Sequence, residues 1–422
     1  MAKKKKKQKK NVGQFILLTI MIFFSAGLIT AMFTLNRQRT NQNAEAENPD
    51  VPESIPEETE IQETTEPKDE YQLVAELTLQ EMTMEEKIYQ LFIVTPEVLV
   101  DNVVNCVVQS GQMTKKALEQ KPVGGIIYFS QNLEAPNQTK EMLSMAQSYI
   151  RDSHPVGLWL AVDEEGGTVA RVADNLGTTQ YSDMSVYGER GDVSEVFMVG
   201  SGIAEDISQF GFNLDFAPVA DVYIDEGNEL QNRIFSRDPA VVSEMVASMV
   251  EGLQNSGAVS ATLKHFPGLG AENGNTHEDA FAYIERTYEE LENTEFLPFK
   301  AGINAGADFV MVGHQIMSCA GDELPSDLSP VVITDWLRGN LGYNGIVVTD
   351  AHNMNTISEN YSSGESAVLA IQAGADIVLM PENLNEAFQA VYDAVEQQEI
   401  SEERINESVL RILTAKAKHH LL

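Results

Sequence analysis

Fifteen residues from Leu263 to His277 place a cation, two imidazoles and three glycines close together in the chain. The stretch begins as the end of a short apolar strand, with Lys264 and His265 at its exit, and continues as a loop. A cation and an imidazole at a strand end, followed by a loop that carries His277, suggest a site that holds a polar ligand and closes over it. A Pro-Gly turn with a solvated loop explains the same residues, so the elements around them must decide.

Short apolar runs alternate with longer amphipathic stretches from about Tyr71 onward, and eight such runs can be counted. Eight strand-helix units in about 350 residues predict an α/β fold, a TIM-type (β/α)8 barrel, with catalytic groups at the carboxyl ends of the strands. The amphipathic stretches include Val242–Leu253, Glu289–Ala305 and Leu384–Val395. The apolar runs are Leu91–Val94, Gly125–Phe129, Leu158–Val162, Asn213–Ala217, Val259–Leu263, Phe309–Val312, Ile346–Val348 and Ile377–Leu379.

In such a barrel, polar residues should gather just after the strands, and they do so for five of the eight runs. Four of the seven histidines, His277 included, are predicted on this rim. A single histidine at a strand end is more often structural than catalytic, and this reading applies to His314 and His352. The polar residues after the third to seventh runs are Asp163, Glu164, Glu165, Arg171, Asp221, Asn232, Arg233, Lys264, His265, His314, Asp350 and His352.

Several kinds of chemistry find no support in the motifs. No Gly-x-Ser-x-Gly elbow is present, which argues against serine-hydrolase chemistry, and no phosphate-binding glycine motif follows a strand, so no cofactor is predicted. No metal is predicted either, although a barrel metallohydrolase using His265, His314 and Asp350 is an open alternative. Such enzymes usually carry a His-x-His pair at the first strand, and Leu91 to Pro96 contains no histidine.

The remaining chemistry is glycoside hydrolysis, in which a carboxylate attacks the anomeric carbon and an acid protonates the leaving oxygen. Asp350 is the best candidate nucleophile because it ends the run Gly345–Asp350, and a rigid strand end fixes its approach. An N-cap of the following helix is the competing role for this aspartate. Charge-assisted bonds to sugar hydroxyls are predicted for Asp163, Arg171, Arg233, Lys264 and His265.

Five segments of the chain resemble, in the same order, the signature segments of glycoside hydrolase family 3. The resemblance covers Tyr71 to the C-terminus, and within the family the chain is similar to the single-domain β-N-acetylhexosaminidases. The segments are Asp163–Gly167, Arg233–Ser236 with Asp238 and Pro239, Lys264–Gly268, Asp327–Ser329, and Thr349–Asp350 with Met354.

The resemblance implies a retaining mechanism through a covalent glycosyl intermediate on Asp350, with His277 acting first as acid and then as base. An imidazole with an unperturbed pKa near 6.5 suits both steps at neutral pH. Terminal β-N-acetylglucosaminides are the implied substrates. Substrate binding is expected of Asp163, Arg171, Arg233, Lys264, His265, His314 and Met354.

Three positions depart from the family's pattern. Asn275 stands where an aspartate would support the loop histidine, Leu269 replaces a second histidine, and Thr168 replaces an arginine. An asparagine can accept a hydrogen bond from the imidazole but supplies no charge, and the equivalent change in a serine-protease triad costs about 10⁴ in turnover. We therefore expect an active but slowed enzyme. The alternatives are a glycan-binding barrel without turnover and a family 3 enzyme of another β-glycoside specificity.

The N-terminus predicts a membrane anchor. Residues 1–12 carry seven lysines and residues 13–35 carry no charge. At about 1.5 Å per residue, residues 13–35 would span about 35 Å as a helix, and a cleaved signal peptide normally has a shorter apolar region. Residues 36–70 are acidic and polar and predict a flexible linker. With the basic tail in the cytoplasm, residues 71–422 would be tethered outside a bacterial cell membrane, where peptidoglycan-derived fragments are the natural substrates.

Charge and cysteine content narrow the possible partners. The net charge of −36 argues against a nucleic-acid partner, because an acidic surface repels phosphates. Cys106 and Cys319 lie far apart and supply neither a disulfide framework nor a zinc site.

The segment Val98–Gln120 is longer than a simple connection between strands, and the sequence assigns it no role. Before it, Thr83 and Glu86 predict a capping box that opens a helix.

Overall fold

The computed structural model describes residues 69–101, 106–228, 230–271 and 281–422. The predicted basic tail, the predicted anchor and the linker up to residue 68 lie outside the described residues. None of the helices in the described ranges combines the length and the apolar composition of a membrane-spanning segment. The residues Glu66–Leu422 form one compact unit, which contains the barrel.

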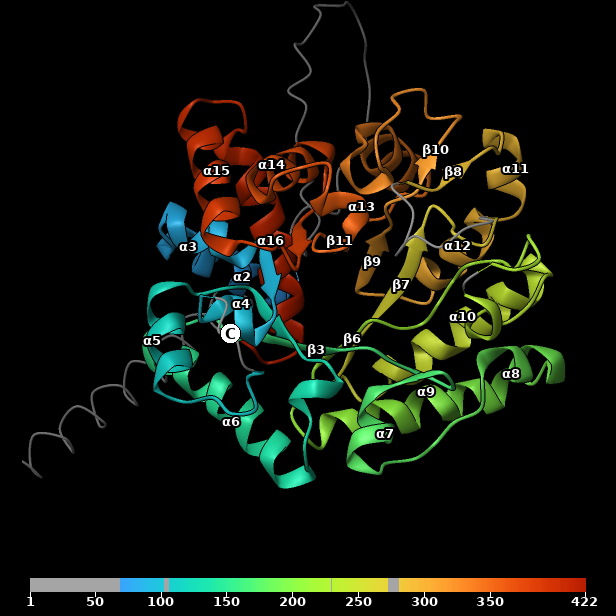
Figure 1. The fold of residues 1–422 in the computed structure, drawn as a ribbon, viewed down its shortest axis with the longest axis horizontal. Coiled ribbons are helices and arrows are strands. Elements are labelled where there is room, and N and C mark those ends of the chain that lie inside the picture. The colour runs from blue at the N-terminus through green and yellow to red at the C-terminus, as the bar shows by residue number, and fades with distance from the viewer. Residues whose placement is uncertain (1–68, 102–105, 229, 272–280) are drawn as a thin grey trace, which may run out of the picture. The chain divides into compact units, whose positions relative to one another are not determined.

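Eight parallel strands close into a barrel, and each overlaps one of the apolar runs of the sequence (Figure 1). Neighbouring strands pair in the order β1, β12, β11, β9, β7, β6, β3, β2, and the last strand of this order pairs with the first. The predicted (β/α)8 barrel is therefore confirmed. The strands are β1 Phe92–Val94, β2 Gly125–Ile127, β3 Trp159–Val162, β6 Leu214–Asp215, β7 Ser260–Phe266, β9 Phe309–Val312, β11 Ile346–Ala351 and β12 Ile377–Leu379.

Helices cover the outside of the barrel in the alternation that the sequence predicts (Figure 1). Two short pairings stand apart from the barrel sheet, β4 (Glu164–Gly166) with β5 (Val169–Ala170) and β8 (Tyr283–Ile284) with β10 (Ile316–Met317). The helices are α2 Glu70–Glu81, α3 Met84–Gln90, α4 Pro96–Leu99, α5 Gln112–Gln120, α6 Pro136–Ser153, α7 Arg171–Leu176, α8 Met184–Arg190, α9 Val193–Ser208, α10 Pro239–Gln254, α11 Tyr288–Asn293, α12 Phe296–Asn304, the wider helix Val331–Asn340, α13 Asn355–Ser358, α14 Ser363–Ala373, α15 Leu384–Glu396 and α16 Glu402–Lys418.

The predicted capping box opens α3. Thr83 Oγ1 accepts a hydrogen bond of 3.2 Å from Glu86 N, and Glu86 Oε2 accepts one of 2.8 Å from Thr83 N. Two backbone donors that a helix start leaves unpaired are thereby satisfied.

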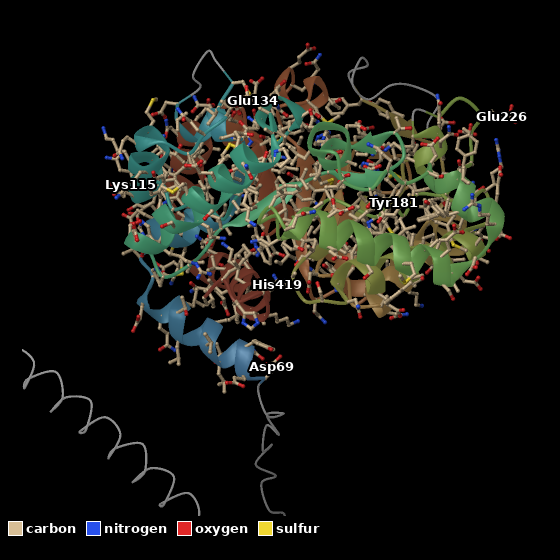
Figure 2. All side chains as sticks on the ribbon, turned by 90° about the horizontal axis from the view of Figure 1, so that it is seen from below. Asp69, Lys115, Glu134, Tyr181, Glu226 and His419 are labelled. Carbon is tan, nitrogen blue, oxygen red and sulfur yellow. The ribbon has the colours of Figure 1, made fainter. Side chains whose placement is uncertain are left out.

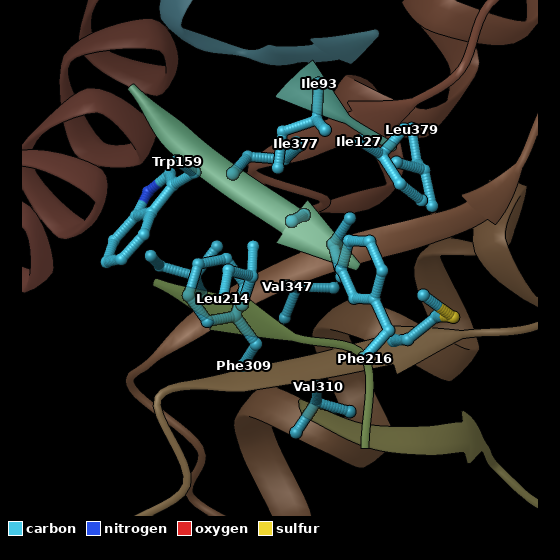
Figure 3. Close-up of a cluster of buried hydrophobic side chains, with 14 of the residues drawn as sticks. Ile93, Ile127, Trp159, Leu214, Phe216, Phe309, Val310, Val347, Ile377 and Leu379 are labelled. Atoms are coloured by element: carbon cyan, nitrogen blue, oxygen red, sulfur yellow. The ribbon is translucent and has the colours of Figure 1, made fainter. Parts of the chain in front are cut away.

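Large apolar side chains fill the barrel interior (Figure 3). Trp159 and Phe309 are fully buried and meet edge to face, with ring centroids 5.3 Å apart. Phe216 and Leu379 are buried toward the carboxyl ends of the strands. Burial of each such side chain contributes about 1.5–3 kcal/mol, so the packed interior gives the strand ends a stable base.

Two strands run further than the sequence predicts. β7 includes Lys264 and His265, and β11 includes Asp350, whereas the apolar runs place these residues just after the strand ends. The pairing continues because Lys264 forms a bridge with Val219, in the loop after β6. These side chains are therefore carried by strand backbone rather than by loops.

Candidate active site

A cavity of about 440 Å³ opens at the carboxyl ends of the strands. Barrel enzymes carry their catalytic groups on this face. Every described residue that the sequence predicts for the site lines this cavity, except His314. The charged and polar lining residues are Asp163, Glu165, Arg171, Arg233, Lys264, His265, Asp350 and Asn353.

Asp350 is held by β11 and lines the cavity. Its Oδ1 accepts a hydrogen bond of 2.7 Å from Ala351 N. Burial raises the pKa of a carboxyl group, but the charges of His314 and His265 outweigh it and hold the pKa of Asp350 below its usual value. Asp350 is therefore ionised at neutral pH, which is the form in which a carboxylate acts as a nucleophile.

His314 lies behind Asp350 rather than in the cavity wall. Its Nδ1 is 3.0 Å from Asp327 Oδ2, and its Nε2 is 3.0 Å from the carbonyl oxygen of Ala351. Because a carboxylate and a carbonyl only accept hydrogen bonds, both ring nitrogens donate and the ring is an imidazolium. Burial opposes this charge, but Asp327 raises the pKa of His314 to about 9. His314 thus supplies a fixed positive charge behind Asp350, and direct substrate binding by it gains no support.

Asp327 joins His314 to a second histidine. Its Oδ2 lies 3.0 Å from His352 Nε2, and the other ring nitrogen of His352 lies 3.0 Å from Ser366 Oγ. Despite burial, the two histidines hold the pKa of Asp327 below its usual value. His352 is absent from the cavity lining and serves as a structural partner of Asp327, as the alternative reading of this histidine predicts.

His265 is oriented by Asp221, a buried residue in the loop after β6. Asp221 Oδ2 lies 2.9 Å from His265 Nδ1 and accepts a hydrogen bond of 3.1 Å from His265 N. Asp221 Oδ1 accepts one of 2.7 Å from Leu269 N. One carboxylate therefore fixes both the imidazole and the turn that follows it, and leaves Nε2 of His265 for the cavity.

Lys264 bridges two carboxylates of the cavity wall. Its Nζ lies 3.0 Å from Asp163 Oδ1 and 2.5 Å from Glu165 Oε1. Arg233 forms a two-pronged ion pair with Glu165, with both N–O distances at 2.8 Å. Burial disfavours the charged form of all three side chains, but the attraction between opposite charges outweighs the effect of burial. It lowers the pKa of Glu165 and raises those of Lys264 and Arg233. The wall thus presents charged donors and acceptors at fixed positions.

Arg171 extends this wall on the other side of Asp163. Its Nε and Nη2 lie 3.3 and 3.2 Å from Asp163 Oδ2. The guanidinium also lies over the ring of Phe129, with its Cζ 4.8 Å from the ring centroid. Asp163 is therefore held between two cations, and Phe129 supports one of them.

Two further carboxyl groups support the turn that carries this wall. Asp215 Oδ1 accepts a hydrogen bond of 2.9 Å from Glu164 N, and the Glu164 oxygens accept from Val172 N at 2.6 Å and Ala173 N at 3.0 Å. Burial raises the pKa of Glu164 to about 7 and that of Asp215 well above its usual value. Neither side chain lines the cavity, so both act on the backbone of the turn.

The comparison with known families decides the identity of the barrel. A sequence profile described as "Glycosyl hydrolase family 3 N terminal domain" matches residues 83–415. The chain belongs to glycosyl hydrolase family 3. The matched range includes all eight strands and every lining residue of the cavity, so the resemblance seen in the sequence is confirmed.

Two family relatives are named as hexosaminidases. Beta-hexosaminidase A from Pseudoalteromonas piscicida is 30% identical over 325 residues, which cover 70% of this chain and 53% of that protein. Beta-hexosaminidase from Stenotrophomonas maltophilia is 35% identical over 289 residues, which cover 65% of this chain and 81% of that protein. The chain thus spans about half the length of the first relative and most of the second.

Solved structures show the same barrel. A family 3 β-N-acetylglucosaminidase from a Paenibacillus species superposes with a TM-score of 0.75 at 34% identity, over 81% of this chain and 63% of that one. A β-N-acetylhexosaminidase from Beutenbergia cavernae superposes with a TM-score of 0.71 at 26% identity, over 80% of this chain and 99% of that one.

The three departures from the family 3 pattern lie in different surroundings. Thr168 is bonded away from the cavity, because its N and Oγ1 both lie 3.0 Å from Asp183 Oδ1. Leu269 lines the cavity and packs in a small apolar cluster with Leu230. Asn275 and the predicted acid His277 lie outside the described residues, so the sequence predictions for both stay predictions.

The metal-dependent alternative gains no support from the described residues. Among them, no three His, Cys, Asp or Glu side chains converge as ligands. His265 and His314 are each bonded to a carboxylate of their own, Asp221 and Asp327, rather than sharing a ligand position with Asp350.

Several residues with a role in the site are absent from the sequence predictions of functional residues, among them Glu165, Asp221 and Asp327. Glu165 and Asp221 follow predicted strands, so their positions gave a signal for the rim. Asp327 lies in a segment that resembles the family pattern. Pairing of a carboxylate with one particular histidine depends on the closed barrel, and no local pattern specifies it.

Proposed function

We propose that this barrel is a retaining glycoside hydrolase that removes terminal β-N-acetylglucosaminyl residues from glycans. The observation that carries the proposal is the ionised Asp350 at the edge of a cavity whose wall is built from paired cations and carboxylates. The relatives named β-hexosaminidase and β-N-acetylglucosaminidase support the reaction type and the sugar.

In the first step, a carboxylate oxygen of Asp350 attacks the anomeric carbon, and the bond to the leaving oxygen breaks as that oxygen takes a proton from an acid. His314, fixed as an imidazolium behind the nucleophile, keeps Asp350 ionised for this attack. Water then attacks the same carbon, gives its proton to the conjugate base and releases Asp350. Net retention of the β configuration follows from two inversions.

We assign the acid and base roles to His277 on the basis of the family resemblance. An imidazole exchanges protons near neutral pH without strong perturbation of its pKa. Sugar hydroxyls would meet the wall formed by Asp163, Arg171 and Lys264, because charged partners bind hydroxyls more strongly than neutral ones. Methyl and ring carbon atoms of the sugar would face the apolar lining, which includes Met354.

We further propose that residues 13–35 anchor the protein in a bacterial membrane, with the barrel outside and peptidoglycan-derived fragments as its substrates. The run of seven lysines before an uncharged stretch supports this orientation. Protease digestion of intact cells tests it, because an external barrel is degraded while a cytoplasmic one is protected.

The activity is tested by steady-state hydrolysis of a chromogenic β-N-acetylglucosaminide by residues 66–422, with Asp350→Ala as the control. We expect turnover by the natural sequence and none above background for the variant. Proton NMR during the reaction should show the β anomer of free N-acetylglucosamine first, as retention requires. Equal rates for the two proteins would rule out Asp350 as the nucleophile. Release of the α anomer as the first product would rule out the retaining mechanism.

A glycan-binding barrel without turnover is the second candidate, and Asn275 is the observation that favours it. This candidate predicts binding of N-acetylglucosamine by calorimetry with no hydrolysis, and hydrolysis that first appears in Asn275→Asp. A panel of β-glucoside and β-xyloside substrates distinguishes another family 3 specificity from both.

A further inference from the structure

The connection between β1 and β2, residues 95–124, is the stretch to which the sequence assigns no role, and its described residues reach the active-site wall. It carries α4 and α5, and α5 packs beside α6. Lys115 of α5 has its Nζ 5.6 Å from the ring centroid of Tyr149 in α6. The connection is therefore packed against the segment that follows β2, and this segment borders the cavity.

Glu97 of α4 joins the connection to that segment. Its Oε1 accepts hydrogen bonds of 2.8 Å from Val107 N and 2.9 Å from Asn132 Nδ2. Asn132 Nδ2 also lies 2.9 Å from the carbonyl oxygen of Val107. The donors of the Asn132 amide are thus accepted by groups of the connection.

Asn132 also contacts Phe129, a residue of the cavity wall. It is fully buried, and its Oδ1 accepts a hydrogen bond of 2.8 Å from Phe129 N. Phe129 lines the cavity and lies beneath the guanidinium of Arg171, which is bonded to Asp163. A buried amide with unmet donors is unfavourable, so the hydrogen bonds that the connection accepts hold Asn132 in this position.

We propose that the β1–β2 connection is a positioning element for the substrate wall, in which Glu97 and Asn132 set the Phe129 ring against Arg171. Glu97 and Asn132 are positioning residues, because neither lines the cavity. The inference rests on the proposed function for the sugar ligand and for the turnover in which the effect is measured.

The series of contacts from Glu97 through Asn132 and Phe129 to Arg171 predicts which kinetic constant changes. They end at the Asp163–Arg171 pair, whereas Asp350 is held by Ala351 and by the charges of His314 and His265. Loosening the connection should therefore weaken sugar binding and leave the attack by the nucleophile nearly intact.

The test compares Glu97→Ala with Glu97→Gln and with Glu119→Gln, a matched change at an exposed glutamate of α5. In Glu97→Ala we expect KM for the chromogenic substrate to rise about tenfold with kcat within about threefold of the natural sequence. Glu97→Gln keeps an oxygen acceptor and should restore KM, and Glu119→Gln should not change it. In a Phe129→Leu background, Glu97→Ala should raise KM no further, because the effect passes through that ring.

Binding of N-acetylglucosamine by calorimetry gives the same test without turnover, and Asn132→Ser takes the place of Glu97→Ala if the latter does not fold. If the natural sequence turns over normally and KM is unchanged in Glu97→Ala and in Asn132→Ser, the positioning role is overturned and the proposed function stands. A KM effect of Glu97→Ala that adds fully to that of Phe129→Leu would overturn the route through the ring. Absence of both turnover and sugar binding in the natural sequence would overturn both proposals.

Discussion

The two ends of the barrel bury similar charges for different purposes. At the amino end, Asp376 is fully buried and accepts hydrogen bonds from Arg338 at 2.5 Å, Arg411 at 3.0 Å and Ser408 at 2.6 Å. Lys416 is buried there too, and its Nζ donates to three oxygen acceptors at 2.7–2.8 Å. Hydrogen bonds to other protein groups thus use most of the donors and acceptors of these two side chains.

At the carboxyl end, the same residue types border a cavity. Asp350 and Lys264 line it, whereas Asp376 and Lys416 do not. Nevertheless, the pKa values of Asp350 and Asp376 are both lowered, in each case because positive charges outweigh burial. A lowered pKa therefore does not separate these two aspartates, whereas access to the cavity does.

The amino end also holds a serine, a histidine and an aspartate in mutual contact. Ser260 Oγ and Asp308 Oδ2 both approach His419 Nε2, at 2.9 and 3.1 Å. Among the described residues, His419 Nδ1 has no hydrogen-bond partner. A catalytic triad needs the serine and the aspartate on opposite ring nitrogens, so this group holds the C-terminus against the barrel instead. His419 and Asp69, at the start of α2, lie on one side of the molecule (Figure 2).

The largest contrast between the two ends should come from Asp350→Asn. This change keeps the shape of the side chain but removes the proposed nucleophile, so we expect kcat to fall by at least about 10³-fold. Steady-state kinetics measures the loss, and thermal unfolding serves as the control for folding. More than a tenth of the original turnover in a folded variant would place the nucleophile elsewhere.

The matched change at the other end, Asp376→Asn, should act on stability alone. Arg338 and Arg411 would lose a buried countercharge, and breaking such a group costs about 3–5 kcal/mol of unfolding free energy. Urea unfolding measures this loss, and the folded fraction should keep kcat/KM within about threefold. A fall in activity without a fall in stability would contradict the division between the two ends.

A pH effect on stability should come from His314, whose folded pKa of about 9 lies above its unfolded value. A raised histidine pKa stabilises the fold fully below about pH 6.5, and the contribution is lost as the pH rises toward 9. The expected loss is about 3 kcal/mol, which urea unfolding at pH 6 and pH 9 can resolve. In His314→Gln this part of the pH dependence should vanish; an unchanged slope would assign it to another group.

A smaller effect on activity is expected for Asp221→Ala at the carboxyl end. His265 would lose the carboxylate that orients its ring, so kcat/KM should fall about tenfold to a hundredfold. Asp221→Asn keeps an oxygen acceptor for the ring and should recover part of the activity. Equal losses in both variants would point to the negative charge rather than to orientation.

The smallest effect should come from Ser260→Ala at the amino end. It removes one hydrogen bond to Asp308 and one to His419, which costs about 1–2 kcal/mol of unfolding free energy. The kinetic constants should not change, because no residue of this group lines the cavity. A tenfold loss of turnover would mean that the amino-end group is coupled to the reaction after all.

The pattern of apolar and polar residues was enough to predict the barrel and most of the residues on its carboxyl-end rim. Apolar runs of strand length alternate with amphipathic stretches, and parallel strands joined by helices bring their carboxyl ends to one face. Residues as distant in the chain as Asp163 and Asp350 could therefore be assigned to one site before any contact was known. The exact strand ends could not, because pairing with a neighbouring loop extended β7 through Lys264.

The pairing of individual charges could not be predicted in this way and depends on the folded barrel. Asp221 and His265 lie 44 positions apart, and Asp327 and His352 lie 25 apart, so no local spacing links them. A pair at 3 Å requires the right register, loop path and rotamer together, and these follow from packing across the whole barrel. For the same reason His314, which the sequence predicts as a substrate ligand, lies outside the cavity wall and places its positive charge near Asp350.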